Sequence, residues 1–332
     1  MAAQLKDRET LRQSSSGGIF SLLAEYVLHK GGIVFGAAFD ENLQCHHIGV
    51  SKIEDLKLLR GSKYVHSEIG KTFTEAQSYL RQGKWVYFTG TPCQIVGLKL
   101  FLRKDYPTLL TSDLICHGTP SQKVFNRFVK GMEQDVKEKI VDWNFRDKSI
   151  AGWACSSSSS SVDKRGMKHR HILNKNMTSY FNAFLGGYLF RMDCYKCPFA
   201  CPDRVSDITL ADYWGVKKFH VFETLHFGVS LVIINNKKGM NIWEMLKDKT
   251  TYVISNMEYA LQTSNRNLRQ SSVMPEGRKN AYWSAFSNFD AFRDSFLDNY
   301  NPFLFYKSYY KRKIKWSPIG FFLIRLLNKH RK

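Results

Sequence analysis

The stretch WVYFTGTPCQIVGLK, residues 85–99, decides the fold class of this chain. Its first half is a short apolar run rich in aromatic residues, which is typical of a buried strand. The Gly-Thr-Pro turn that follows begins a helix with proline near its first position, so Cys93 falls in the first helical turn. Unpaired amide groups and the helix dipole favour a thiolate there. A strand that leads into a helix is the repeating unit of an α/β sheet.

The alternation of strand and helix continues on both sides of this stretch. Before it, a serine- and glycine-rich segment at residues 14–18 leads into a helical pattern, and serine is a favoured residue for capping a helix start. The expected elements are helices at 19–30, 72–82, 95–103 and 124–129, and strands at 33–39, 45–52, 84–90 and just before Cys116. The sequence therefore predicts an α/β fold, α+β overall, with a largely parallel sheet flanked by helices.

The pattern changes after about Val141, where residues 141–162 and 169–175 indicate twisted antiparallel strands. The serine run Ser156–Ser161 lies between strand-like segments, which favours a strand or its turn over a linker. Strands at 207–214 and 228–235 return to a sheet, and the chain is helical from about Leu261. We expect three regions: an α/β lobe at 12–135, a second lobe at 136–262, and a helical, basic C-terminal region at 263–332.

The composition limits the class of protein. Of the 332 residues, 43% are hydrophobic, enough for a sizeable core, and 49 Lys and Arg against 29 Asp and Glu give a net charge of +20. This charge favours anionic partners, but the basic residues are dispersed and no nucleic-acid-binding motif accompanies them, so no nucleic acid is expected. The chain lacks a signal-peptide pattern and the run of about 18 apolar residues that a spanning helix requires, which indicates the cytoplasm.

The segment at residues 307–332 combines an apolar patch with basic flanks. Two interpretations stay open for it. One is peripheral contact with an anionic membrane, and the other is a terminal helix that packs on the body of the protein with a solvated basic face.

Four of the seven cysteines have the placement of ligands to a metal or a cluster. Disulfides are rare in the cytoplasm, so spacing has to identify the role of each cysteine. Cys93 and Cys116 each follow a predicted strand, and if those strands are parallel neighbours both sulfurs emerge at the same carboxyl edge. Cys194 and Cys197 have the two-residue spacing that lets both sulfurs face one site.

The spacing alone fits a structural zinc site and an iron–sulfur cluster equally well. Cys201 extends the run to Cys-x-x-Cys-x-x-x-Cys and is a reserve ligand. Cys45 and Cys155 stand alone in strand-like segments and are expected to be small buried residues.

Seven motifs occur in order between about Ser14 and Val216: SSSGGIFSLL, LRGSKYVHS, FTGTPCQIVGLK, DLICHGTPS, FRDK, CYKCPFA and DRVSDITLADYWGV. Together they resemble the beta-subunit family of coenzyme F420-reducing hydrogenases and formate dehydrogenases. That family also includes ferredoxin-dependent reductases of the chlorophyll pathway and bacterial members near polysaccharide genes.

The resemblance implies FAD beside a 4Fe-4S cluster, with Cys93, Cys116, Cys194 and Cys197 as the cluster ligands. It assigns flavin binding to the glycine-rich turn and to a basic segment, namely Gly17, Gly18, Arg60, Gly61, Ser62, Lys63 and Tyr64. Small residues and helix-start amides suit a phosphate, which agrees with this assignment. His117 is a candidate for tuning the cluster or contacting the flavin, and equally for a structural hydrogen bond. The block of Asp207, Asp212 and Trp214 is expected to support folding.

The resemblance implies an oxidoreductase that passes electrons between a ferredoxin-like donor, the cluster, FAD and an organic substrate, either a deazaflavin coenzyme or a polysaccharide-pathway metabolite. A separate donor is expected because relatives often carry an N-terminal two-cluster ferredoxin module, whereas this sequence starts close to the flavin motif. The alternatives are a non-catalytic relay subunit of a larger complex and a structural zinc protein. No catalytic acid or base is assigned, because no residue pair stands at mechanistic spacing.

Overall fold

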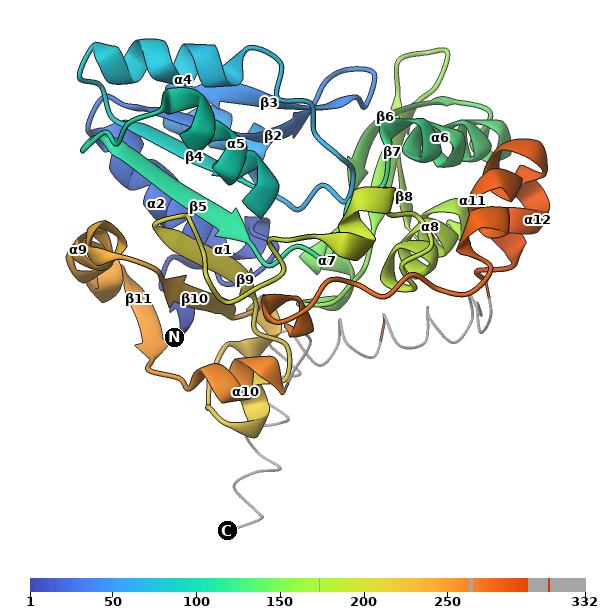
Figure 1. Cartoon of the computed structure of the whole chain (residues 1–332). Coiled ribbons are helices and arrows are strands. Elements are labelled where there is room, and N and C mark those ends of the chain that lie inside the picture. The colour runs from blue at the N-terminus through green and yellow to red at the C-terminus, as the bar shows by residue number, and fades with distance from the viewer. Residues whose placement is uncertain (173, 263–264, 298–309, 311–332) are drawn as a thin grey trace.

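The computed structural model describes residues 1–172, 174–262, 265–297 and 310 (Figure 1). It contains an eight-stranded sheet and a separate three-stranded sheet, each covered by helices. The strand order of the larger sheet is β11-β1-β10-β9-β5-β4-β2-β3. Its strands are β1 (Ala2–Leu5), β2 (Ile33–Phe39), β3 (Cys45–Val50), β4 (Val86–Gly90), β5 (Leu109–Leu114), β9 (Ile208–Asp212), β10 (Ser230–Ile234) and β11 (Thr250–Val253).

The centre of this sheet is parallel and its two sides are antiparallel. Strands β2, β4, β5 and β9 run parallel to one another, while β3 on one side and β10, β1 and β11 on the other pair antiparallel. The predicted α/β class with a largely parallel sheet lobe is confirmed. Because β4 and β5 are parallel neighbours, their carboxyl ends meet at one edge of the sheet.

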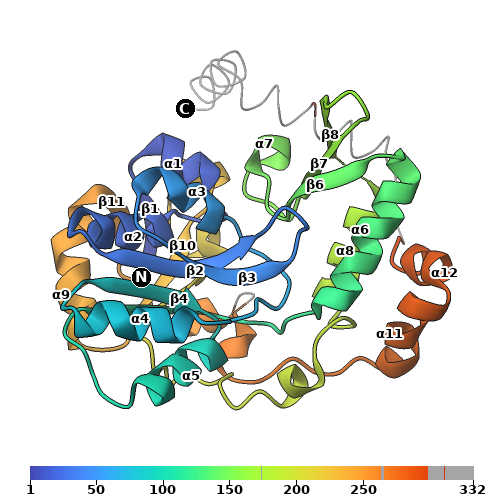
Figure 2. The same cartoon turned by 90° about the horizontal axis from the view of Figure 1, so that it is seen from above.

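Alternating side chains give this sheet two apolar faces, each covered by helices (Figure 2). One face packs against α2 (Ile19–His29) and α9 (Lys237–Leu246), and the other against α4 (Thr72–Arg81) and α5 (Pro92–Leu102). Tyr87 on β4 points to the first face, whereas Val86 and Phe88 point to the second.

The smaller sheet has its own aromatic core. Strands β6 (Lys139–Asn144), β7 (Ser158–Val162) and β8 (Lys168–Ile172) form an antiparallel meander, as predicted for this region. Most of the serine run therefore lies in a strand. Its core is shared with α6 (Gln122–Val136), α8 (Lys175–Leu185), α11 (Arg278–Ser287) and α12 (Phe289–Asp294). The last two helices confirm the helical C-terminal region for its described part.

The remaining helices are short. They are α1 (Arg8–Gln13), α3 (Leu56–Leu59), α7 (Lys148–Ala151) and α10 (Met257–Leu261). Within the described ranges, no helix combines the length and the hydrophobicity that crossing a bilayer requires. Apart from Tyr310, the segment at 307–332 lies outside the described residues, and the boundaries at 135 and 262 stay predictions.

The start of α2 differs from the expected serine cap. The N-cap residue is Gly18, with φ of +83°, and no side chain caps the first amides. The serines are engaged elsewhere: the Ser14 hydroxyl donates to the Thr10 carbonyl and the Ser16 hydroxyl to the Val229 carbonyl. The amides at the start of α2 are therefore left without a side-chain partner.

Candidate functional site

The four predicted cluster cysteines lie at the carboxyl edge of the parallel strands. Cys93 is in the first turn of α5, which begins with a capping box between Thr91 and Gln94 directly after β4. Cys116 follows the end of β5 by two residues. Cys194 lies in the 3-10 helix Met192–Lys196, and Cys197 ends that helix.

The thiols of these cysteines are close enough to influence one another. Burial raises the pKa of Cys116 to about 12, with smaller contributions from Cys194, Cys93 and Cys197. Burial also raises the pKa of Cys197, with Cys93 and Cys194 contributing. In the described part of the chain, no set of three or more His, Cys, Asp and Glu side chains is arranged to hold a single metal ion.

Three of the cysteines line a cavity of about 450 Å³, a volume typical of small-molecule sites. Cys93, Cys194 and Cys197 belong to the lining of this cavity, which we call the cysteine cavity. Other parts of the lining come from the segment at residues 14–20 and from the segment Arg60–Lys63. The fold thus brings motifs from four separate parts of the sequence to one space.

Two backbone segments are fixed against each other at this cavity. The Ser62 amide donates to the Ser15 hydroxyl at 2.8 Å, which ties the Arg60–Lys63 segment to the serine loop. The Lys63 amine donates to the Leu58 and Arg60 carbonyls, and burial lowers the pKa of Lys63 to about 8. Since Gly18 also lines the cavity, the uncapped start of α2 faces the same space.

The predicted flavin residues divide into two groups. Those that line the cysteine cavity are Gly18, Arg60, Gly61, Ser62 and Lys63. The other three are described by the structure but do not line it. Gly17 packs its Cα against the backbone of Ala3 and Ser230, and the carbonyl of His117 accepts a hydrogen bond from Ser272. The Tyr64 ring lies among the aromatic rings Phe145, Phe181 and Phe184.

The other three cysteines do not line the cysteine cavity. Cys201 donates its thiol to the Asp203 carbonyl at 3.3 Å. Cys45 is buried, as expected, and burial raises its pKa to about 12. Cys155 is exposed, so the expectation that it is buried is wrong, because it lies in the loop between α7 and β7 and not in a strand.

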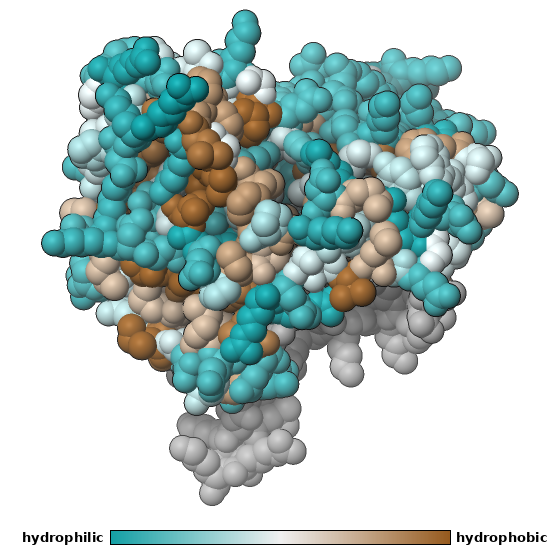
Figure 3. Space-filling view, viewed as in Figure 1, coloured by the Kyte–Doolittle hydropathy of each residue, from teal (hydrophilic) through white to brown (hydrophobic). Residues whose placement is uncertain are grey.

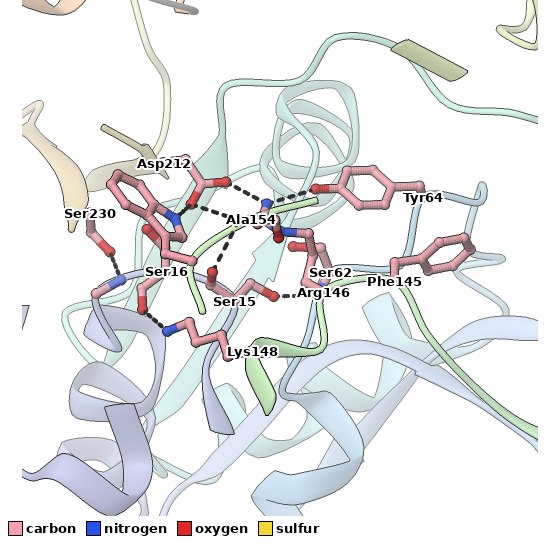
Figure 4. Close-up of polar contacts among 12 residues, drawn as sticks. Ser15, Ser16, Ser62, Tyr64, Phe145, Arg146, Lys148, Ala154, Asp212 and Ser230 are labelled. Atoms are coloured by element: carbon pink, nitrogen blue, oxygen red, sulfur yellow. Dashed lines mark hydrogen bonds and ion pairs between the residues drawn. The ribbon is translucent and has the colours of Figure 1, made fainter. Parts of the chain in front are cut away.

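Arg146, from the FRDK motif, joins the smaller sheet to the serine loop (Figure 4). Its guanidinium contacts both carboxylate oxygens of Asp212, at 2.6 and 3.3 Å, and donates to the Tyr64 hydroxyl and the Ser15 carbonyl. The Trp153 indole nitrogen donates to Asp212 as well. Asp212 lines the cysteine cavity, so this buried ion pair fixes part of its wall, in line with the folding role expected for Asp212.

A second network, which was not anticipated from the sequence, connects the cavity to the Cys93 helix. The Nδ1 atom of buried His47 accepts from the Ser67 hydroxyl, and its Nε2–H donates to the Thr89 carbonyl. Gln94, next to Cys93, donates to Ser67. Burial lowers the pKa of His47 to about 4, so His47 is neutral at pH 7. The Thr-x-x-Gln capping pattern was the sequence signal for Gln94, whereas His47 had none.

Comparison with known proteins identifies one family. The family described as the C terminus of the coenzyme F420 hydrogenase/dehydrogenase beta subunit matches residues 83–259, which is more than half of the chain. No curated protein matches the chain. Among solved structures, a chain of the F420-reducing NiFe hydrogenase complex from Methanosarcina barkeri, studied by xenon derivatization, is similar at 18% identity and a TM-score of 0.49, with 87% of this chain and 92% of that chain covered. From the family match, this chain belongs to the coenzyme F420 hydrogenase/dehydrogenase beta subunit family.

Proposed function

We propose that this chain is an iron–sulfur flavoprotein oxidoreductase of the cytoplasm. In this proposal, electrons pass between a ferredoxin-like donor, a 4Fe-4S cluster held by Cys93, Cys116, Cys194 and Cys197, and FAD in the cysteine cavity. The final partner is an organic substrate, a deazaflavin coenzyme or a polysaccharide-pathway metabolite. Family membership supports a redox protein of the hydrogenase/dehydrogenase beta-subunit type.

One observation carries the proposal. The cysteine cavity is lined by three cysteines together with the serine-glycine loop and the Arg60–Lys63 segment. The fourth thiol, Cys116, is within electrostatic reach of the other three. Four neighbouring thiols without a cation between them are costly to ionise together, and a bound cluster supplies the positive charge that stabilises thiolates. The donor set therefore fits a cluster beside a flavin-sized space.

The chain's own residues fit the task of holding and orienting these groups. The uncapped start of α2 at Gly18 offers amide donors to a flavin phosphate, and the Ser15–Ser62 hydrogen bond keeps the two cavity segments together. A cluster exchanges single electrons, and a flavin converts single electrons into hydride chemistry on an organic molecule. Neutral His47 does not supply a proton at pH 7, so the acid–base residues stay unassigned.

Rapid mixing with a reduced ferredoxin under anaerobic conditions tests this order of electron transfer. We expect bleaching of the flavin absorbance in the wild type and much slower bleaching in Cys93→Ser, because the cluster lies between donor and flavin. Cys201→Ser is the matched control and should behave as the wild type, since the Cys201 thiol bonds to a backbone carbonyl outside the set. Equal rates in wild type and Cys93→Ser would exclude the cluster from the route.

A relay subunit is the second candidate, and one surface favours it. Helix α5 carries the exposed side chains Leu100 and Phe101, and Cys93 at its start is also exposed. Figure 3 shows hydrophobic side chains gathered over α5, on the face seen there. An exposed apolar patch often marks a protein contact. Turnover of a reduced deazaflavin by the isolated chain would contradict the relay function, whereas turnover that requires an added subunit would support it.

A further inference from the structure

A second, larger cavity lies against the cysteine cavity. Its volume is about 1330 Å³, above the range of about 300–1,000 Å³ that is usual for small-molecule sites. The segment Arg60–Lys63 lines both cavities and is therefore their shared wall. Other parts of the lining come from α1, from the FRDK motif and from residues 223–227. We call this space the basic cavity.

The charges that line the basic cavity are mostly positive. Three carboxylates, Asp142, Asp147 and Glu223, stand against seven Lys and Arg side chains. Asp147 is already paired with Arg170, at 2.7 Å. The cations are Arg8, Arg12, Lys57, Arg60, Lys63, Arg146 and Lys148. Two of these cations are paired with carboxylates outside the lining, Arg146 with Asp212 and Arg60 with Glu25. The other five still outnumber Asp142 and Glu223, the lining carboxylates that form no ion pair in the described ranges.

Lys148 adds a buried amine to the wall without a carboxylate partner. Its amine donates to three backbone carbonyls, those of Leu11, Ser16 and Phe227, and among the described residues it forms no ion pair. Burial lowers the pKa of Lys148 to about 7. The pKa of His226 falls to about 4 through burial and through the charges of Arg12, Arg8 and Lys148, in that order. Arg8, Arg12 and Lys148 thus lie close enough to His226 to act on the same part of the basic cavity.

Three exposed cations stand at the rim: Arg8 and Arg12 on α1, and Lys57 on α3. Arg8 and Arg12 are four residues apart, so they project from one face of α1. The Arg12 guanidinium lies over the Phe227 ring, 5.3 Å from its centre, which limits its orientation. No carboxylate in the described ranges pairs with Arg8, Arg12 or Lys57, so their charges are available to a ligand.

We propose that the basic cavity binds the polyanionic part of the organic substrate, a small molecule that carries phosphate or carboxylate groups. This inference rests on the proposed flavin chemistry, because the Arg60–Lys63 wall places the ligand beside the cysteine cavity. Arg8, Arg12 and Lys57 recognise the anionic groups, and the buried Lys148 amine lies deeper in the wall. None of the three rim residues belongs to a motif that defines the flavin or cysteine segments.

Calorimetric titration of the flavin-loaded protein with inorganic pyrophosphate tests this site. The rim variant R8Q/R12Q/K57Q is compared with K71Q/R81Q/K130Q, which removes the same number of exposed charges elsewhere. We expect the rim variant to bind pyrophosphate about tenfold more weakly, while the control changes by less than about twofold. A parallel titration with citrate distinguishes carboxylate from phosphate recognition. The probe that binds with the higher affinity identifies the group that the site prefers.

Two results would overturn the inference. Equal pyrophosphate affinity in the wild type and the rim variant would show that these cations do not bind an anion. Loss of FAD from the rim variant would show that the cavity holds the diphosphate of the cofactor and not the substrate. The flavin content of the purified protein distinguishes a failure of this inference from a failure of the proposed function. Protein that binds pyrophosphate through the rim residues but purifies without flavin would contradict the proposed function and leave the anion site in place.

Discussion

The two cavities share the Arg60–Lys63 wall but are built in different ways. The cysteine cavity is formed at strand ends and helix starts, and its walls are held by close backbone contacts and buried hydrogen bonds. At the rim of the basic cavity stand exposed side chains, Arg8, Arg12 and Lys57, on short helices. Changes in the first should damage the fold along with the site, whereas changes at the rim of the second should alter binding alone.

Gly17→Ala is expected to have the largest effect on stability. A Cβ at Gly17 would lie 2.3 Å from the Ala3 carbonyl oxygen and 2.6 Å from the Ser230 amide nitrogen, so β1 and β10 would have to shift. We expect a loss of about 3 kcal/mol or more in the free energy of unfolding, measured by urea denaturation. Gly166→Ala is the control: it has space around the added Cβ and a φ of +78°, and should lose only about 1 kcal/mol. Equal losses would contradict a tightly built wall.

Arg146→Met should have the next largest effect on stability. We expect a loss of about 3 kcal/mol in the free energy of unfolding, because the substitution leaves the Asp212 carboxylate without its guanidinium partner. The double variant Arg146→Met/Asp212→Asn removes that charge and should lose less than the sum of the two single variants. The free energies of unfolding of all three variants complete the cycle. Strict additivity would show that the ion pair does not stabilise the wall.

We expect His47 to have a smaller, pH-dependent effect on the free energy of unfolding. Its pKa is about 4 in the folded protein, below the usual value of about 6.5 in an unfolded chain. The unfolded state therefore binds the extra proton first, and stability falls as the pH drops from 6.5 towards 4. We expect His47 to account for about 2 kcal/mol of lost stability at pH 5 relative to pH 7.5. In His47→Asn this part of the pH dependence should be missing; an unchanged profile would contradict a buried neutral histidine.

The rim cations should have the smallest effect on the fold. Because Arg8, Arg12 and Lys57 are exposed and form no ion pair in the described part of the chain, each Gln substitution is expected to change the free energy of unfolding by less than about 0.5 kcal/mol. Urea denaturation measures this directly. A loss as large as that of Gly17→Ala would mean that the rim is structural, and the contrast between the two cavities would fail.

The same contrast explains which features the sequence could predict. Cys93 and Cys116 could be placed because each follows an apolar run, and the ends of parallel strands meet at one edge of a sheet. Gly18 and Ser62 could be assigned because each belongs to a short motif of consecutive residues. These features depend on short-range patterns, which a sequence shows directly.

The features that were missed depend on contacts between distant segments. His47 and Ser67 form a pair only because β3 and the segment before α4 lie side by side. Tyr64 belongs to a flavin-like motif, but its ring packs among aromatic residues of the core that the smaller sheet shares with α8. The rim cations carry no spacing signal at all, since Lys57 is 45 residues from Arg12 in the sequence and joins it only through the fold.

The central claim is that four cysteines bind a cluster beside a flavin in the cysteine cavity. Iron, sulfide, zinc and FAD should be quantified in anaerobically purified wild type, Cys194→Ala and Cys201→Ser. The account predicts about four irons and one FAD in the wild type and in Cys201→Ser, with the iron lost in Cys194→Ala. One zinc and no flavin in the wild type would contradict it and assign the four cysteines to a structural site.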